Sequence, residues 1–155
     1  MKTAHDMIQE KGSEILSVPE GTIVIEALEK MNAGNVGAIM VTRNDTAVGI
    51  WTERDLMRNM IDTTFDPHTT RIEEVMTKDV IFTSHTDTVY NLMDKFLGLR
   101  LRHLLIKKDG KTIGMVSSGD VMRACIQEKD AELKQLNSIV GWDYYENWRW
   151  HPESK

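Results

Sequence analysis

Hydrophobic and polar residues follow a pattern along this chain that occurs twice. In the first occurrence, an apolar run at residues 15–18 precedes four apolar residues with the i, i+3, i+4, i+7 spacing of one helix face: Val24, Ala27, Leu28 and Met31. Apolar runs at residues 36–41 and 47–51 then predict two strands, and a second helix is expected to begin at Thr52. The expected order is strand, helix, strand, strand, helix.

The second occurrence becomes visible when the sequence is shifted by 65 residues against itself. Gly49 then coincides with Gly114 and Asp55 with Asp120, without a gap between the copies. The second copy has its own apolar runs at residues 80–82, 104–106 and 112–116. Its helix stripe lies within residues 89–96, and its second helix is expected to begin at Ser117. Because neither copy has many core residues of its own, the two are expected to pack face to face.

These patterns divide the chain into five parts. A short helix with Met7 and Ile8 facing inward is expected over residues 1–11, the first repeat over 12–62 and the second over 72–128. A polar linker joins the repeats over residues 63–71, and a helical extension with an aromatic tail occupies residues 129–155. The expected fold class is α+β, with two β-α-β-β-α repeats and flanking N- and C-terminal helices.

Several residues have alternative interpretations at the level of sequence. Core packing is the expected role of Cys125 and of five methionines that occupy stripe positions: Met31, Met57, Met60, Met93 and Met122. Helical spacing continues beyond the second repeat through Ile126, Leu133, Leu136 and Val140. Five aromatic residues follow: Trp142, Tyr144, Tyr145, Trp148 and Trp150. This tail either packs within the chain or forms an interface, since exposed aromatic residues suit both roles.

Composition narrows the class of protein. The chain has 155 residues, of which 41% are hydrophobic and 28% charged, and its net charge of −5 argues against nucleic-acid binding through a general basic field. Its longest apolar run is far shorter than the roughly 20 residues of a membrane helix, so no membrane association is expected. The single cysteine excludes an internal disulfide, and the polar N-terminus does not resemble a secretion signal. We therefore expect a cytoplasmic protein.

Candidate chemistry lies where the last strand of each copy meets its second helix. Thr52 and Asp55 in the first copy, and Ser117 and Asp120 in the second, place a hydroxyl at the helix start and a carboxylate three residues later. A helix start favours a phosphate, and a carboxylate suits the two hydroxyls of a ribose. The alternative is a capping box, in which the same side chains only satisfy backbone groups.

The sequence resembles a tandem of cystathionine-β-synthase (CBS) domains, the Bateman module, of the small stand-alone bacterial type. The resemblance covers residues 12–128 and rests on these motif segments: 36–41 and 49–55 in the first copy, and 75–80, 101–104 and 114–120 in the second. It implies a cleft between the copies that binds an adenosine nucleotide such as AMP, ADP, ATP or NAD. S-adenosylmethionine carries the same adenosine group and stays open as an alternative.

The resemblance also implies roles for individual residues. Asp55 and Asp120 would hold ribose hydroxyls, and Ile15 and Val80 would lie against the base. Thr52, Arg54, Ser117 and Gly119 would follow the phosphates. Gly37 and Ala38 in one copy, and Arg102 and His103 in the other, would lie near adenine or phosphate. Because these last two pairs differ in charge, the two clefts are expected to differ in affinity, with an empty cleft on one side as the extreme case.

The leading hypothesis is a non-catalytic regulatory module that signals nucleotide occupancy, as in energy sensing, through a conformational or assembly change. It would need no other cofactor and no metal, since His103 has no second ligand at metal spacing. The resemblance favours a homodimer, whereas the downstream protein partner is unknown. The alternative hypothesis is an interaction module with vestigial clefts and an aromatic docking tail. An enzyme is disfavoured because no general base or metal site stands out.

Overall fold

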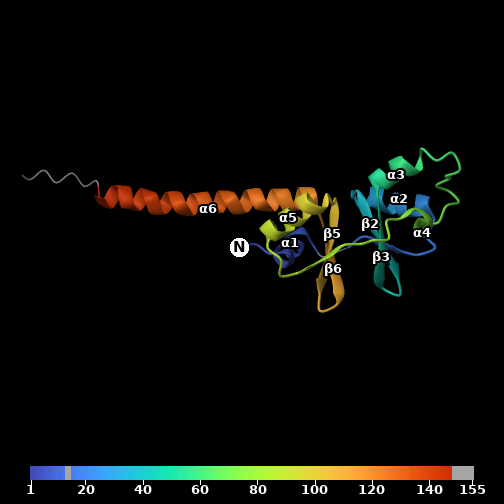
Figure 1. The fold of residues 1–155 in the computed structure, drawn as a ribbon, viewed down its shortest axis with the longest axis horizontal. Helices are drawn as coiled ribbons and strands as arrows, with labels where there is room; N and C mark the ends of the chain where they lie inside the picture. The colour runs from blue at the N-terminus through green and yellow to red at the C-terminus, as the bar shows by residue number, and fades with distance from the viewer. Residues whose placement is uncertain (13–14, 148–155) are drawn as a thin grey trace, which may run out of the picture.

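A computed structural model describes residues 1–12 and 15–147 (Figure 1). In chain order the elements are α1 (Ala4–Lys11), β1 (Ser17–Pro19), α2 (Val24–Ala33), β2 (Ala38–Arg43), β3 (Thr46–Thr52), α3 (Glu53–Asn59), α4 (Ile72–Val75), β4 (Phe82–Ser84), α5 (Val89–Leu99), β5 (His103–Lys108), β6 (Lys111–Ser117) and α6 (Ser118–Asn147). The two copies predicted from sequence are confirmed as two three-stranded sheets with helices, an α+β fold.

The two sheets have the same topology. In the first, β1 pairs parallel with β2, and β2 pairs antiparallel with β3; β4, β5 and β6 repeat this order. Each hairpin turns through two residues with positive φ, Asn44-Asp45 and Asp109-Gly110, which are residue types that tolerate this backbone conformation. The Asp-Gly pair was therefore a correct signal for the second hairpin.

The opening strand of each repeat begins two residues later than the apolar runs predict. Residues 15–16 and 80–81 precede β1 and β4, although Leu16 and Ile81 each accept one sheet hydrogen bond through their carbonyl groups. Ile15 and Val80 instead pack against the cluster of buried residues between the two repeats. Their hydrophobicity therefore reflects contact between the repeats rather than a place inside a strand.

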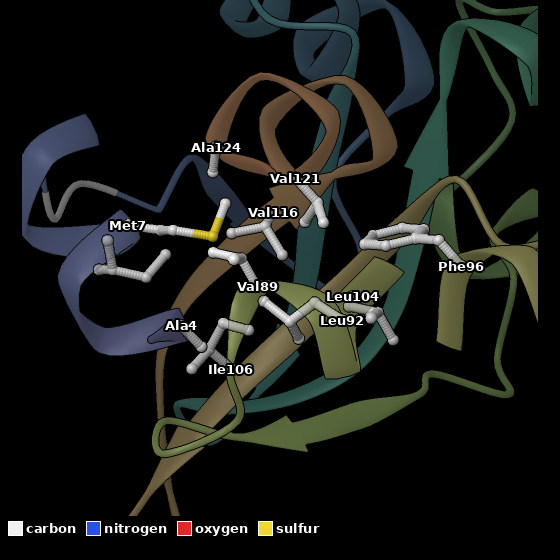
Figure 2. Close-up of a cluster of buried hydrophobic side chains, with 11 residues drawn as sticks. Ala4, Met7, Val89, Leu92, Phe96, Leu104, Ile106, Val116, Val121 and Ala124 are labelled. Carbon is white, nitrogen blue, oxygen red and sulfur yellow. The ribbon is translucent and has the colours of Figure 1, made fainter. Parts of the chain in front are cut away.

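The helix that comes before the first strand of each repeat packs on the other repeat. Ala4, Met7 and Ile8 of α1 lie in the core of the second repeat, and Figure 2 shows Met7 pointing towards Val116 and Ala124. A reciprocal capping box between Thr3 and Asp6 starts this helix. Ile72 of α4 is in turn fully buried in the core of the first repeat. The expected inward faces of Met7 and Ile8 are confirmed, but the core they join is 80 or more residues away along the chain.

A third hydrophobic cluster joins the repeats. Ala38, Met40 and Ile50 of the first repeat are buried against Leu105 of the second, with Val80, Phe82 and Met115 among the partly buried neighbours. Both sheets present strand residues to this cluster. The predicted face-to-face packing is confirmed, and the cluster provides the floor on which a site between the repeats can form.

The prediction of a core role is wrong for three methionines. Met57, Met60 and Met122 are 61%, 63% and 55% exposed, whereas Met31 is buried and Met93 packs against the second core. Helix α3 buries no residue completely: Leu56 packs on the core of the first repeat and is partly buried, whereas Met57 and Met60 point away from that core. Cys125 is half-buried, as expected for a packed thiol, and burial raises its pKa.

Helix α6 continues well past the second repeat and projects from the body (Figure 1). Its apolar residues Leu133, Leu136, Ile139 and Val140 are all exposed. The side chains of Trp142, Tyr144 and Tyr145, and all of Trp148 and Trp150, lie outside the described residues. None of the helices within the described residues is long and apolar enough to cross a membrane.

Candidate functional site

A cavity of about 280 Å³ opens between the two repeats on the side of Asp55. It is lined by residues of both repeats: Ile50, Thr52, Arg54, Asp55, Arg58, Thr77, Asp79, Val80, Ile81, Arg100, Leu101, Arg102 and His103. Six residues predicted from the sequence meet here: Thr52, Arg54, Asp55, Val80, Arg102 and His103. Its volume is near the lower end of the range of about 300–1,000 Å³ for ligand sites.

Asp55 is held at the cavity by its own helix start. The Thr52 backbone N–H and hydroxyl donate to Asp55 Oδ2 at 2.9 and 3.0 Å, and the Asp55 N–H donates to Thr52 Oγ1 at 3.3 Å. The capping box considered from the sequence is therefore present. All of these bonds to the carboxylate use Oδ2, so Oδ1 keeps its acceptor capacity for a group in the cavity.

The cavity is lined by four arginines but only two carboxylates, so its side chains carry a net positive charge. Arg54 and Arg58 lie one helical turn apart on α3. Arg100 is the C-cap of α5 and adopts the left-handed conformation, with φ 51°. Arg58 and Arg100 were missed by the sequence analysis: the spacing of Arg54 and Arg58 was a usable signal, whereas nothing local marks the turn at Arg100.

His103 begins β5 and lines the same cavity. Burial lowers its pKa below the ordinary value of 6.5, with a further decrease from Lys11 and Arg102, while Asp120 and Asp55 oppose the decrease. The imidazole is therefore neutral at pH 7. As the pH falls below 6.5, the unfolded chain takes up this proton before the folded chain does, so this histidine lowers the free energy of unfolding in that range.

Asp120, the counterpart of Asp55, lies in a different environment. The Ser117 N–H donates to its Oδ2 at 2.9 Å, as in the first copy, but Lys11 Nζ also lies 2.7 Å from the same oxygen. Burial alone would raise the pKa of Asp120, but the hydrogen bonds from Lys11 and Ser117 lower it below its usual value. The carboxylate faces a separate cavity of about 190 Å³ that Lys11 and Arg123 also line.

The remaining predicted site residues are dispersed. Ile15 and Ala38 line a small cavity of about 70 Å³. Gly37 faces the Glu53 carboxyl group in a fourth cavity, of about 180 Å³, and its carbonyl accepts the Glu53 N–H. Gly119 has open space around its Cα, with the Ser117 hydroxyl at 3.8 Å from where a Cβ would lie. The sequence predicts two clefts that differ in affinity. In the structure, one cavity of about 280 Å³ forms beside Asp55, whereas Asp120 lines a smaller cavity of about 190 Å³ and its predicted companions Ile15 and Ala38 line another of about 70 Å³.

Metal-binding potential is low in the described part of the chain. No cluster of three or more histidine, cysteine, aspartate or glutamate residues occurs among residues 1–12 and 15–147 with a geometry that could hold a metal ion. The four arginines outnumber the two carboxylates at the cavity, so the arrangement suits an anion with a hydroxyl-bearing group.

Comparison with known proteins identifies the family of this chain. A family model described as "CBS domain" matches residues 8–62 and again residues 72–127. The mitochondrial CBS domain-containing protein CBSX3 of Arabidopsis thaliana is 32% identical over 151 residues, which cover 92% of this chain and 73% of the plant protein. Several other plant relatives are much longer, and this chain spans about a quarter of their length.

Solved structures share the fold. The crystal structure of the CBS domain protein NE2398 matches with a TM-score of 0.76 and 35% identity, covering 81% of this chain and 99% of that one. The CBS domain pair of protein MJ0100, solved in complex with 5′-methylthioadenosine and S-adenosyl-L-methionine, matches with a TM-score of 0.71 over 83% of this chain and 98% of that one. That second protein is 18% identical, so its likeness concerns the fold alone.

Proposed function

This chain belongs to the CBS-domain family as a tandem pair, and from that membership we propose that it is a non-catalytic regulatory module that binds an adenosine nucleotide beside Asp55. The observation that carries the proposal is the cavity of about 280 Å³ between the repeats, which combines two carboxylates, Asp55 and Asp79, with four arginines. Ile50, Val80 and Leu101 supply apolar surface in the same cavity. The apolar surface suits the base, the Asp55 carboxylate suits the ribose hydroxyls, and the arginines suit the phosphates.

The arginines favour a ligand with phosphate groups. Guanidinium groups bind phosphate oxygens through two parallel hydrogen bonds, and AMP, ADP, ATP and NAD all carry such oxygens. S-adenosylmethionine has the same adenosine but carries a positive sulfonium, which the four arginines would repel. The MJ0100 pair, of the same fold, was solved with adenosine-containing ligands, and our proposal for this chain differs in preferring the anionic members of that class.

Calorimetric titration with AMP, ADP, ATP, NAD and S-adenosylmethionine tests the proposal. We expect binding of at least one phosphate-bearing ligand, with weaker or no binding of S-adenosylmethionine. A ligand present at 100 times its dissociation constant would also stabilise the fold by about 2.7 kcal/mol, a shift that a thermal melt detects. Absence of binding by all four phosphate-bearing ligands would contradict the proposal.

Binding is expected to be coupled to proton uptake at His103. Phosphate oxygens near the imidazole favour its charged form and so raise a pKa that burial now holds low. Affinity should therefore increase as the pH falls from 8 to 6, and titration in buffers of different ionisation enthalpy should reveal the proton taken up. The ligand's own phosphates also titrate, so the control is H103Q with the same ligand. An equal pH dependence in both proteins would contradict a role for His103.

Occupancy is proposed to act through the arrangement of the two repeats. The cavity walls come from both repeats, so a bound nucleotide stabilises the relative orientation that holds it best. A ligand with different affinities for two orientations shifts the equilibrium between them. The same shift would change whatever surface the protein offers to a second copy or a downstream partner.

A second candidate function, interaction through the helical extension, is favoured by the exposed stripe on α6. Ile126, Leu133, Leu136 and Val140 recur at coiled-coil spacing, and each is more than half exposed. A single projecting helix of this kind gains little stability alone. We propose that a second copy of the chain covers the stripe, since an identical helix offers the same spacing, and that the protein is a homodimer.

The stripe makes a direct prediction about assembly. The double variant L133S/L136S removes two apolar contacts and is expected to lower the molar mass measured by light scattering from that of a dimer to that of a monomer. The control variant Q135S changes the same helix on the face opposite the stripe and should leave the dimer intact. A monomeric parent protein, or a double variant that remains dimeric, would contradict this interface.

A further inference from the structure

The two aspartates that the repeats place at equivalent positions differ in their partners. Lys11 Nζ lies 2.7 Å from Asp120 Oδ2 and 3.5 Å from the Met115 carbonyl oxygen. On the first side, the backbone N–H of Thr77 donates at 2.8 Å to the carbonyl of Ile50, the counterpart of Met115. No described cation makes an ion pair with Asp55.

This difference arises from the lengths of α1 and α4, the two helices that each pack on the other repeat. Ile8 of α1 and Met76, the C-cap of α4, occupy matching places, because each would meet a Cβ added to the equivalent glycines Gly114 and Gly49. Helix α4 ends at this place, whereas α1 continues to Lys11. The extra turn of α1 carries the Lys11 ammonium to Asp120, whereas the chain after Met76 has left its helix and places the Thr77 N–H on the Ile50 carbonyl and Asp79 at the cavity beside Asp55.

Lys11 also separates two cavities on its side of the molecule. One, of about 190 Å³, is lined by Asp120 and Arg123, and the other, of about 70 Å³, by Ile15 and Ala38. Among the described residues, Lys11 alone lines both. The corresponding region on the first side is the continuous cavity of about 280 Å³. The side chain of Lys11 therefore stands where a ligand would have to pass from the carboxylate to the apolar part of the cleft.

We propose that Lys11 closes the second cleft by occupying Asp120 and dividing the space in front of it, so that each chain holds one nucleotide instead of two. The proposal rests on the proposed function, since it concerns the counterpart of the nucleotide cavity. Lys11 therefore determines how many nucleotides each chain binds. Its ammonium takes the place that the ribose hydroxyls would take at an open aspartate, and it neutralises the carboxylate that would attract them.

The experiment is a calorimetric titration of the full chain with AMP. The parent is expected to bind one equivalent, and K11A, which removes the ammonium and joins the two cavities, is expected to bind two. The second equivalent should be at least tenfold weaker than the first, because Gly119, Gly37 and Ala38 stand where the first side has Arg54, Arg102 and His103. Adding D120N to K11A should return the stoichiometry to one.

A matched control is available in the ion pair between Arg43 and Glu20. Its side chains are 63% and 22% exposed, close to the 50% and 21% of Lys11 and Asp120, and neither residue lines any of these cavities. R43A should therefore bind one equivalent of AMP. Thermal melting of K11A, with R43A for comparison, verifies that the fold is retained.

The possible outcomes separate this proposal from the proposed function. If the parent already binds two equivalents, or if folded K11A still binds only one, the closure by Lys11 is wrong while nucleotide binding beside Asp55 stands. If the parent binds none and K11A binds one that D120N removes, the closure is right and the site beside Asp55 is wrong. If neither protein binds AMP, both proposals are overturned.

Discussion

Replacing Asp55 with alanine is expected to weaken binding of the nucleotide by roughly 10- to 100-fold. The carboxylate is positioned by Thr52 through Oδ2, and its second oxygen is available to accept from a ribose hydroxyl. Loss of a charge-assisted hydrogen bond costs about 1.5–3 kcal/mol, which corresponds to this change in affinity. Calorimetric titration with the tightest-binding nucleotide of the panel measures it.

The chain contains its own control for this substitution. Asp120 makes the same two backbone hydrogen bonds with its helix start, but it is paired with Lys11, so D120A is expected to leave the affinity within about twofold of the parent. Because D55A also removes part of a capping box, D55N is a useful second variant: it keeps an acceptor oxygen for the Thr52 N–H and removes the charge. Equal binding by D55A and the parent would show that the ribose assignment is wrong.

Replacing Leu105 with alanine is expected to lower the free energy of unfolding by about 2–5 kcal/mol, the usual cost of truncating a buried leucine. Leu105 is 0% exposed and packs on Ala38, Met40 and Ile50 of the other repeat. Its loss therefore leaves a void in the contact between the repeats as well as in the sheet. Urea denaturation followed by circular dichroism measures the change.

The comparison for this prediction is a leucine of the same repeat that lies on the surface. Leu97 of α5 is 71% exposed, and L97A is expected to change the free energy of unfolding by no more than about 0.5 kcal/mol. L105A should also weaken nucleotide binding, because the cavity walls come from both repeats. A loss of stability below about 1 kcal/mol would mean that the cluster between the repeats contributes little to holding them together.

Much of the fold could be predicted from the sequence because its signals are local and occur twice. Residues only a few positions apart predict the helices α2 and α5 through their apolar stripes, and the second hairpin through Asp109-Gly110. The match of Gly49 with Gly114 and Asp55 with Asp120 then identified two copies of one unit, and the family follows from the motifs that surround them.

The prediction failed where apolar residues do not face the core of their own repeat. Met57, Met60 and Met122 have the correct helical spacing for burial but are exposed, because a stripe shows that one face is apolar without showing what covers it. Ile15 and Val80 read as strand residues, but they pack between the repeats and precede the strands. Hydrophobicity indicates that a side chain packs against other residues, but which residues those are depends on distant parts of the chain.

By itself, the sequence determined the class of fold and the duplication, since repeated local patterns encode both. The family resemblance proposed twelve site residues, and the structure decided which six of them meet at the cavity beside Asp55. The sequence also predicts that the two clefts differ in affinity, but only the tertiary structure decided that they differ in shape and in the partner of the aspartate. That difference depends on α1 crossing to the second repeat, where its last turn carries Lys11 to Asp120, 109 residues away along the chain. Contacts between such distant residues depend on how the repeats pack, and no local pattern in a single sequence reports them.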